Sequence, residues 1–155
     1  MKNAGTLAVS TPSAREVVLT RVFDAPRELV EEAFRTPQLL GQWFGPRGWR
    51  MTECTMDWRE GGRFRFLLQG PEGGALGISG VYRELGDART VHTETFDGYP
   101  GESVVTTELI ADGERTMLRA TIEYASEEIR DAVIRSGMEH GAAETYDRLA
   151  EMLAR

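Results

Sequence analysis

Few side chains in this sequence are of the types that bind metals or act as nucleophiles. The chain has two histidines and one cysteine, and they fall on three different predicted elements: His92, His140 and Cys54. Their separation matches no spacing typical of zinc or other transition-metal sites, so we predict no metal. Cys54 has no histidine or helix N-terminus placed to activate it, which is typical of an inert buried thiol.

Sequence motifs for catalysis and cofactor binding are also missing. The chain lacks the nucleophile elbow, the phosphate-binding loop, the dinucleotide fingerprint and the zinc-protease motif. We therefore predict no organic cofactor. The sequence identifies no catalytic residue and favours a protein that is not an enzyme.

Two polar residues in predicted strands are candidates for holding the polar group of a ligand. Arg21 shares its place in the strand alternation with Leu19 and Phe23, which favours an inward side chain that needs a partner. An arginine that reaches past the sheet edge to solvent is equally consistent with the pattern. His92 either faces the interior or is an ordinary exposed strand histidine. Four carboxylates also fall in predicted strands, where solvation accounts for them less easily: Glu53, Asp57, Glu94 and Glu108.

Aromatic residues gather in the stretch that joins the first helices to the sheet: Trp43, Phe44, Trp49 and Trp58. Packing in a hydrophobic core is the commoner role of such residues. The alternative is the wall or mouth of an apolar ligand pocket, where large rings accompany a few polar groups. The sequence leaves both interpretations open.

The elements that position these residues follow from periodicity and turn residues. Residues 15–23 are rich in β-branched residues, which predicts a strand. Residues 24–34 and 36–44 then predict two short helices, each with a proline near its start. Further on, glycine-rich turns separate more strands, and the short connections favour antiparallel pairing. With the first strand these make a seven-stranded sheet, the others being predicted at 49–58, 62–69, 76–85, 89–97, 102–111 and 115–124.

A long helix is predicted over residues 126–153, with Ser126 as its N-cap. Its apolar pattern changes phase partway, because Ile129 and Val133 fall on the opposite side of the helical wheel from the stripe that follows. We therefore predict a break or bend near residues 135–138. The second half is expected to pack on the sheet through Met138, Ala142, Thr145, Leu149 and Met152.

Two glycines lie inside this helix, Gly137 and Gly141. Each is expected to cost ~1 kcal/mol relative to alanine in a helix interior. They either leave volume free beside the helix or permit its close approach to the sheet. The pattern does not decide between a cavity and close packing.

The composition limits the classes of partner. The chain has 155 residues and a formal net charge of −7 at pH 7. Nucleic acids and anionic membrane surfaces require a basic face, so we predict neither as a partner. A single cysteine excludes an internal disulfide, which fits a reducing compartment. Residues 1–14 are predicted to form a flexible tail without a signal-peptide pattern, and residues 15–155 a single domain. We expect a soluble cytoplasmic protein, either a monomer or a homodimer.

Five stretches of the chain carry a family resemblance. They are, in order, "TRVFDAPRELVEEAF", "TPQLLGQWFGPRGW", "ECTMDWREGGRFRF", "GVYREL" and "SGMEHGAAETYDRLAEML". Together they resemble the activator of heat shock protein 90 ATPase homologue-like family of the START-related (SRPBCC) superfamily, over residues 16–154. The resemblance implies an α+β helix-grip (START-like) fold, in which a seven-stranded curved antiparallel sheet wraps around a long C-terminal helix and two short helices follow the first strand.

The resemblance also implies a function for that fold. We expect a domain that binds a small apolar or amphipathic molecule in a cavity between the sheet and the C-terminal helix. One alternative is a co-chaperone-like regulator of a heat-shock chaperone ATPase in the stress response, which needs a chaperone partner and an exposed apolar patch. A further alternative is an enzyme of cyclase or hydrolase type that acts inside the cavity. The expected cavity residues are Trp43, Trp49, Phe66, Leu118, Ala120, Ile122, Ile134, Met138, Gly141 and Ala142, with Arg21 and His92 as polar anchors.

Overall fold

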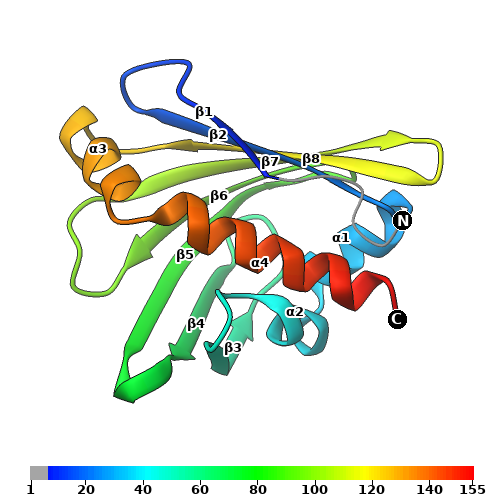
Figure 1. Ribbon diagram of the computed structural model, residues 1–155, viewed down its shortest axis with the longest axis horizontal. Helices are drawn as coiled ribbons and strands as arrows, with labels where there is room; N and C mark the ends of the chain where they lie inside the picture. The colour runs from blue at the N-terminus through cyan, green and yellow to red at the C-terminus, as the bar shows by residue number, and fades with distance from the viewer. Residues whose placement is uncertain (1–6) are drawn as a thin grey trace.

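The computed structural model describes residues 7–155, and within that range eight strands form one antiparallel sheet. The strands lie side by side in the order β1-β2-β8-β7-β6-β5-β4-β3 (Figure 1). Apart from β1, they are the strands that alternation and turn residues predicted, with ends shifted by about two residues at most. Their bounds are β1 Ala8–Ser10, β2 Glu16–Phe23, β3 Arg50–Met56, β4 Arg63–Gln69, β5 Ala75–Leu85, β6 Arg89–Phe96, β7 Ser103–Asp112 and β8 Arg115–Glu123.

Strand β1 is a departure from the prediction. Ala8 lies opposite Thr20 and Ser10 lies opposite Val18, so β1 pairs with the outer side of β2. The predicted seven-stranded sheet therefore gains an eighth strand, and the predicted tail over residues 1–14 is wrong for this segment. Three residues are too few to show an alternation in the sequence, although pairing shields the edge of β2 from other chains. Residues 1–6 of the predicted tail lie outside the described residues.

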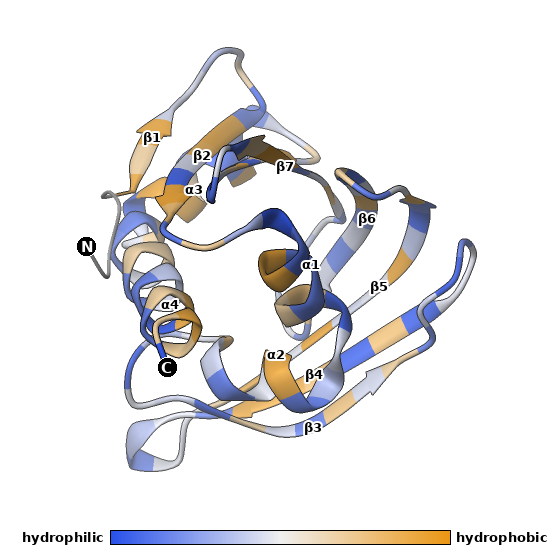
Figure 2. Ribbon diagram, turned by 90° about the vertical axis from the view of Figure 1, so that its right-hand side faces the viewer, coloured by the Kyte–Doolittle hydropathy of each residue, from blue (hydrophilic) through white to orange (hydrophobic). Residues whose placement is uncertain are grey.

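The sheet is strongly curved, and β5 contains two causes of the curvature. A Cβ atom added to Gly80 would lie 1.8 Å from the backbone oxygen of Thr93 in β6, so only glycine fits at this position. The register between β5 and β6 also shifts between Tyr82 and Glu84, and such irregularities increase the bend and twist of a strand. Seen in the direction of Figure 2, the sheet curls around an interior, and α4 lies along its open side.

Two short helices follow β2, as predicted. Helix α1 spans Arg27–Arg35 and α2 spans Pro37–Trp43, while a single 3-10 turn, η1, spans Pro71–Gly73. Both α1 and α2 sit at one end of the curved sheet, where their apolar residues face its interior (Figure 2). Val30, Leu40 and Trp43 of these helices are almost completely buried.

The predicted C-terminal helix is two helices, as its change of phase indicated. Helix α3 spans Glu127–Arg135 and α4 spans Met138–Leu153, which crosses the concave face of the sheet (Figure 1). The Ser126 hydroxyl accepts a hydrogen bond from the Ile129 amide at 3.1 Å, which confirms the predicted N-cap. Gly137 separates the helices with a φ of +90°, a left-handed conformation that glycine adopts without steric cost.

The break lets each helix pack a different set of residues against the sheet. Ile129 and Val133 of α3 contact the core, and so do the α4 residues Met138, Ala142, Leu149 and Met152. Ile134 does not join them, because its side chain is 40% exposed. The predicted apolar stripe therefore begins at α4 and does not extend back into α3.

Candidate functional site

A cavity of about 780 Å³ lies between the concave face of the sheet and helix α4. Its size falls within the range usual for ligand pockets. The sheet, α1 and α2, and the paired helices α3 and α4 all contribute to its walls. Most of the wall is aromatic or aliphatic, and it includes Leu19, Phe34, Leu40, Trp43, Phe44, Phe64, Phe66, Leu68, Ile78, Val105, Leu109, Ala120, Ile122, Val133 and Met138.

Trp43 forms a rigid part of this wall. Its indole Nε1 donates a hydrogen bond to the Ala33 backbone oxygen at 3.1 Å, which fixes α2 against α1. Its ring meets Phe34 edge-on at 4.9 Å and stacks on Tyr146 of α4 at 6.5 Å. Trp43 thus combines the two roles that the sequence left open, since it packs in the core and also lines the cavity.

Most of the residues predicted to line a cavity do line this one. Gly141 is the informative member, because a Cβ atom added there would touch only Pro46 Cγ, at an ordinary contact distance of 3.5 Å. The absence of a side chain at Gly141 therefore leaves space on the cavity side of α4, and glycine is not required there for close packing of the helix on the sheet. The predicted residues in the lining are Trp43, Phe66, Ala120, Ile122, Met138, Gly141 and Ala142, with His92.

Three predicted lining residues lie elsewhere, and the structure corrects them. The Trp49 ring packs against Gly70, where an added Cβ would come within 2.5 Å of a ring carbon, on the outside of the cavity. Leu118 points inward but is completely buried in the closed part of the core. Ile134 is on the exposed side of α3, because the helix breaks before the stripe begins.

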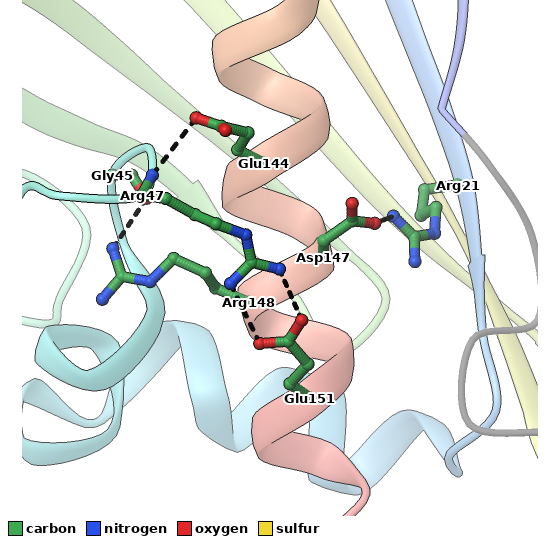
Figure 3. Close-up of polar contacts among 7 residues, drawn as sticks. All are labelled: Arg21, Gly45, Arg47, Glu144, Asp147, Arg148 and Glu151. Atoms are coloured by element: carbon green, nitrogen blue, oxygen red, sulfur yellow. Dashed lines mark hydrogen bonds and ion pairs between the residues drawn. The ribbon is translucent and has the colours of Figure 1, made fainter.

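Arg21 points inward, as one of the two interpretations of its strand position predicted. Its side chain has no solvent exposure, and Nη1 donates to Asp147 Oδ1 of α4 at 2.8 Å (Figure 3). Its guanidinium carbon also lies 5.3 Å from the centre of the Phe23 ring. Arg21 does not line the cavity, so its predicted role as an anchor for a ligand is corrected to that of an ion pair joining β2 to α4.

His92 and Glu94 form a polar pair in the cavity wall. Both lie on β6 and face the cavity, and His92 Nε2 is 3.1 Å from Glu94 Oε2. The His92 ring meets Phe64 edge-on at 5.5 Å. The sequence predicts His92 as a polar anchor, whereas Glu94 stands out in it only as a carboxylate within a strand. The two residues are two positions apart in a predicted strand, which places both side chains on the same face. This spacing could have identified them as a pair.

Three tyrosines add hydroxyl groups to the cavity wall: Tyr82, Tyr124 and Tyr146. Burial, with a contribution from the nearby Glu94, raises the pKa of Tyr124 to about 12 and raises that of Tyr146 as well. Burial also raises the pKa of Tyr82, whose hydroxyl has no hydrogen-bond partner among the described residues. None of the three was predicted as a cavity residue, and the place of Tyr146 depends on how α4 lies across the sheet.

A polar frame fixes α4 against the segment that follows α2, residues 44–49 (Figure 3). Arg148 Nη1 donates to the Gly45 backbone oxygen at 2.8 Å and lies within reach of neighbouring carbonyls of the same segment. Arg47 pairs with Glu151 through both guanidinium Nη atoms, and its amide donates to Glu144 Oε1 at 3.3 Å. Because Gly45 and Pro46 line the cavity, these contacts hold one of its walls in place.

Groups that would bind a metal ion do not cluster in residues 7–155, where no three histidine, cysteine or acidic side chains come together. Cys54 is a half-buried free thiol, and burial raises its pKa. In the same part of the chain, no helix has both the length and the apolar character needed to cross a membrane.

Comparison with solved structures gives close matches. A protein from Rhodobacter sphaeroides is 35% identical with a TM-score of 0.91, and the match covers 97% of this chain and 99% of that one. A Chromobacterium violaceum protein is 27% identical, with a TM-score of 0.79 and coverage of 92% and 99%. A Nitrosomonas europaea protein is 26% identical, with a TM-score of 0.81 and coverage of 92% and 96%. No curated protein matches this sequence.

The family comparison agrees with these structures. Residues 24–154 match the model of the family described as "Activator of Hsp90 ATPase homolog 1-like protein". That range contains every element from α1 to α4. The α+β architecture, with a curved antiparallel sheet gripping a C-terminal helix, is the START-like fold that the resemblance implied. The chain belongs to the Activator of Hsp90 ATPase homolog 1-like family.

Proposed function

We propose that this protein binds a small apolar or amphipathic molecule in the cavity between its sheet and helix α4. The observation that carries the proposal is a cavity of about 780 Å³ with a largely aromatic and aliphatic wall and a few polar groups. This combination is typical of small-molecule binding sites. The open volume at Gly141 supports it, because nothing but Pro46 would touch a side chain's first atom there.

The apolar wall sets the expected strength of binding. A ligand that transfers about 400 Å² of apolar surface from water gains about 10 kcal/mol at about 25 cal/mol per Å². The loss of translational and rotational freedom costs about 4 kcal/mol or more. At most about 6 kcal/mol remains, which corresponds to a dissociation constant of tens of micromolar or weaker. Tighter binding requires hydrogen bonds to the polar groups in the wall.

Native mass spectrometry of the protein purified from its own cells tests the proposal directly. We expect a mass excess of a few hundred daltons that disappears on denaturation, since pockets of this size hold drug-sized molecules. Titration of the emptied protein with an apolar fluorescent probe should then show saturable binding, displaced by the released molecule. A protein without retained ligand that also fails to bind any apolar probe would contradict the proposal.

The family description favours a second candidate, regulation of a chaperone ATPase. Such a role acts through an exposed surface and does not depend on the cavity. It predicts that the purified protein changes the steady-state ATPase rate of a heat-shock protein 90 chaperone. It also predicts that filling the cavity leaves this effect unchanged, which separates the two candidates.

A further inference from the structure

A polar cluster lies in the wall of the cavity among its apolar residues. It consists of the His92–Glu94 pair on β6 and the hydroxyl-bearing side chains of Tyr124 and Tyr146. Tyr146 is on α4 and Glu94 is on the sheet, so the cluster spans the cavity from one wall to the other. Glu94 lies close enough to both tyrosines to affect their ionisation.

The cluster has hydrogen-bonding capacity that the protein does not use. Beside an ionised carboxylate, a neutral histidine places its hydrogen on the nitrogen facing that carboxylate, so His92 Nε2 donates to Glu94 Oε2. The other carboxylate oxygen, Oε1, accepts no hydrogen bond from residues 7–155. Within the same residues, neither the Tyr124 nor the Tyr146 hydroxyl has a hydrogen-bond partner. The free groups are thus one anionic acceptor and two hydroxyls.

The arginines in the wall lie outside the cluster and have acidic neighbours. Arg89 Nη1 is 3.0 Å from Glu84, and Arg35 Nη1 is 3.9 Å from Glu31, which also pairs with Arg27 at 3.2 Å. Among the described residues the cavity lining contains no other arginine and no lysine. An anionic group that enters the cavity beside β6 would therefore meet the Glu94 charge with no arginine or lysine in the cluster to balance it, and like charges in an apolar site repel strongly.

We infer that the cavity selects amphipathic molecules whose polar end donates a hydrogen bond, an amine or a hydroxyl on an apolar body, and that it discriminates against carboxylates. The donor would bind Glu94 Oε1, and the Tyr146 hydroxyl would complete its coordination from the opposite wall. Hydrogen bonds to charged groups are the stronger kind, so the polar end is oriented toward β6. This inference rests on the proposed function of the cavity and adds the class of ligand.

An anthracene series tests it, because the three members share one apolar and fluorescent body. The parent hydrocarbon reports the cavity alone, while aminoanthracene and anthracene carboxylate differ from each other only in the polar group. Binding is measured by fluorescence titration at about pH 8, above the usual titration range of histidine. We expect aminoanthracene to bind about tenfold or more tightly than the carboxylate, the effect of one charge-assisted hydrogen bond.

Two variants with the same change in charge test whether Glu94 causes the preference for aminoanthracene over the carboxylate. Glu94→Gln is expected to bring the ratio of the two affinities close to one, whereas Glu108→Gln should leave it unchanged. Glu108 also lies on a strand, β7, but it pairs with Arg119 at 3.5 Å and does not line the cavity. Tyr146→Phe provides a second probe of the cluster and should weaken aminoanthracene about threefold without affecting anthracene.

The outcomes separate the inference from the proposed function. If all three compounds bind with equal affinity, the cavity binds apolar molecules but the inferred selection is wrong. If the carboxylate binds more tightly, or if Glu108→Gln abolishes the preference as Glu94→Gln does, the inference is overturned as well. If even the parent hydrocarbon fails to bind, the proposed function itself is refuted. The ratio measured on the unaltered protein decides the matter should Glu94→Gln fail to fold.

Discussion

Replacing Gly141 by leucine is expected to fill part of the cavity without destabilising the fold. Gly141 lies inside α4, and its φ is not in the left-handed region. An added Cβ would contact only Pro46 Cγ, at 3.5 Å. Gly141 lines the cavity, so we expect the remaining leucine atoms to extend into it.

The structure sets the magnitude of the effect. Leucine in place of glycine in a helix interior recovers up to ~1 kcal/mol of helix propensity. For a domain of about 150 residues this corresponds to a rise of about 2–4 °C in Tm. Close packing of α4 on the sheet would give the opposite sign, because overpacking a filled core costs about 1–3 kcal/mol.

Gly41→Leu is a matched control for this experiment. Gly41 also lies inside a helix, α2, with no atom within 4 Å of an added Cβ, and it does not line the cavity. Both variants should hold or gain stability in thermal and urea unfolding, but only Gly141→Leu should weaken binding of an apolar fluorescent probe. A Gly141→Leu protein that melts earlier and binds the probe no less tightly would refute the reasoning and show that α4 is closely packed at this point.

Three further changes test other parts of the fold. Gly137→Ala should lower the free energy of unfolding by about 1–2 kcal/mol in urea titrations, because its φ of +90° strains an L-residue; an unchanged midpoint would contradict this. Asp147→Ala should cost up to about 3 kcal/mol, since it leaves the charge of Arg21 buried without its ion-pair partner, whereas Arg21→Met should cost less; equal losses would argue against a penalty from the buried charge. The free energy of unfolding should fall as pH rises from about 10 to about 12, because the unfolded state loses its tyrosine protons at lower pH than the folded state does. Tyr124→Phe should make this fall less steep, and an equally steep fall in the variant would show that Tyr124 does not contribute.

The extent of the strands was predictable because β-branched residues alternate between well-marked turns. Strand β1 was not predictable, since Ala8–Ser10 is too short to display a period and depends on pairing with β2. The break between α3 and α4 was predictable from the change of phase near Gly137. The prediction that Ile134 lines the cavity was wrong, because periodicity does not show how a residue packs when the helix breaks beside it.

The site was predictable only in part. Leu118 and Ala120 share one face of β8, and alternation places both inward. Whether an inward residue meets the cavity or another side chain depends on its position along the strand, and here Ala120 meets the cavity while Leu118 is enclosed. The cluster around Glu94 could not be predicted from the sequence either, because the position of Tyr146 depends on the path of α4 across the sheet.

The two glycines of the C-terminal segment, Gly137 and Gly141, have different roles. Gly137 takes a conformation that lets α3 and α4 pack different faces, so its cost in helix propensity is offset by the burial of Val133 and Met138 against the core. Gly141 has no such compensation, since it has an ordinary helical conformation and a side chain there would meet only Pro46. Alanine at this position would fit the space and stabilise the helix by ~1 kcal/mol. A residue that lowers stability and keeps a cavity open is expected in a binding site, whereas a core that only stabilises the fold has no need of such a residue.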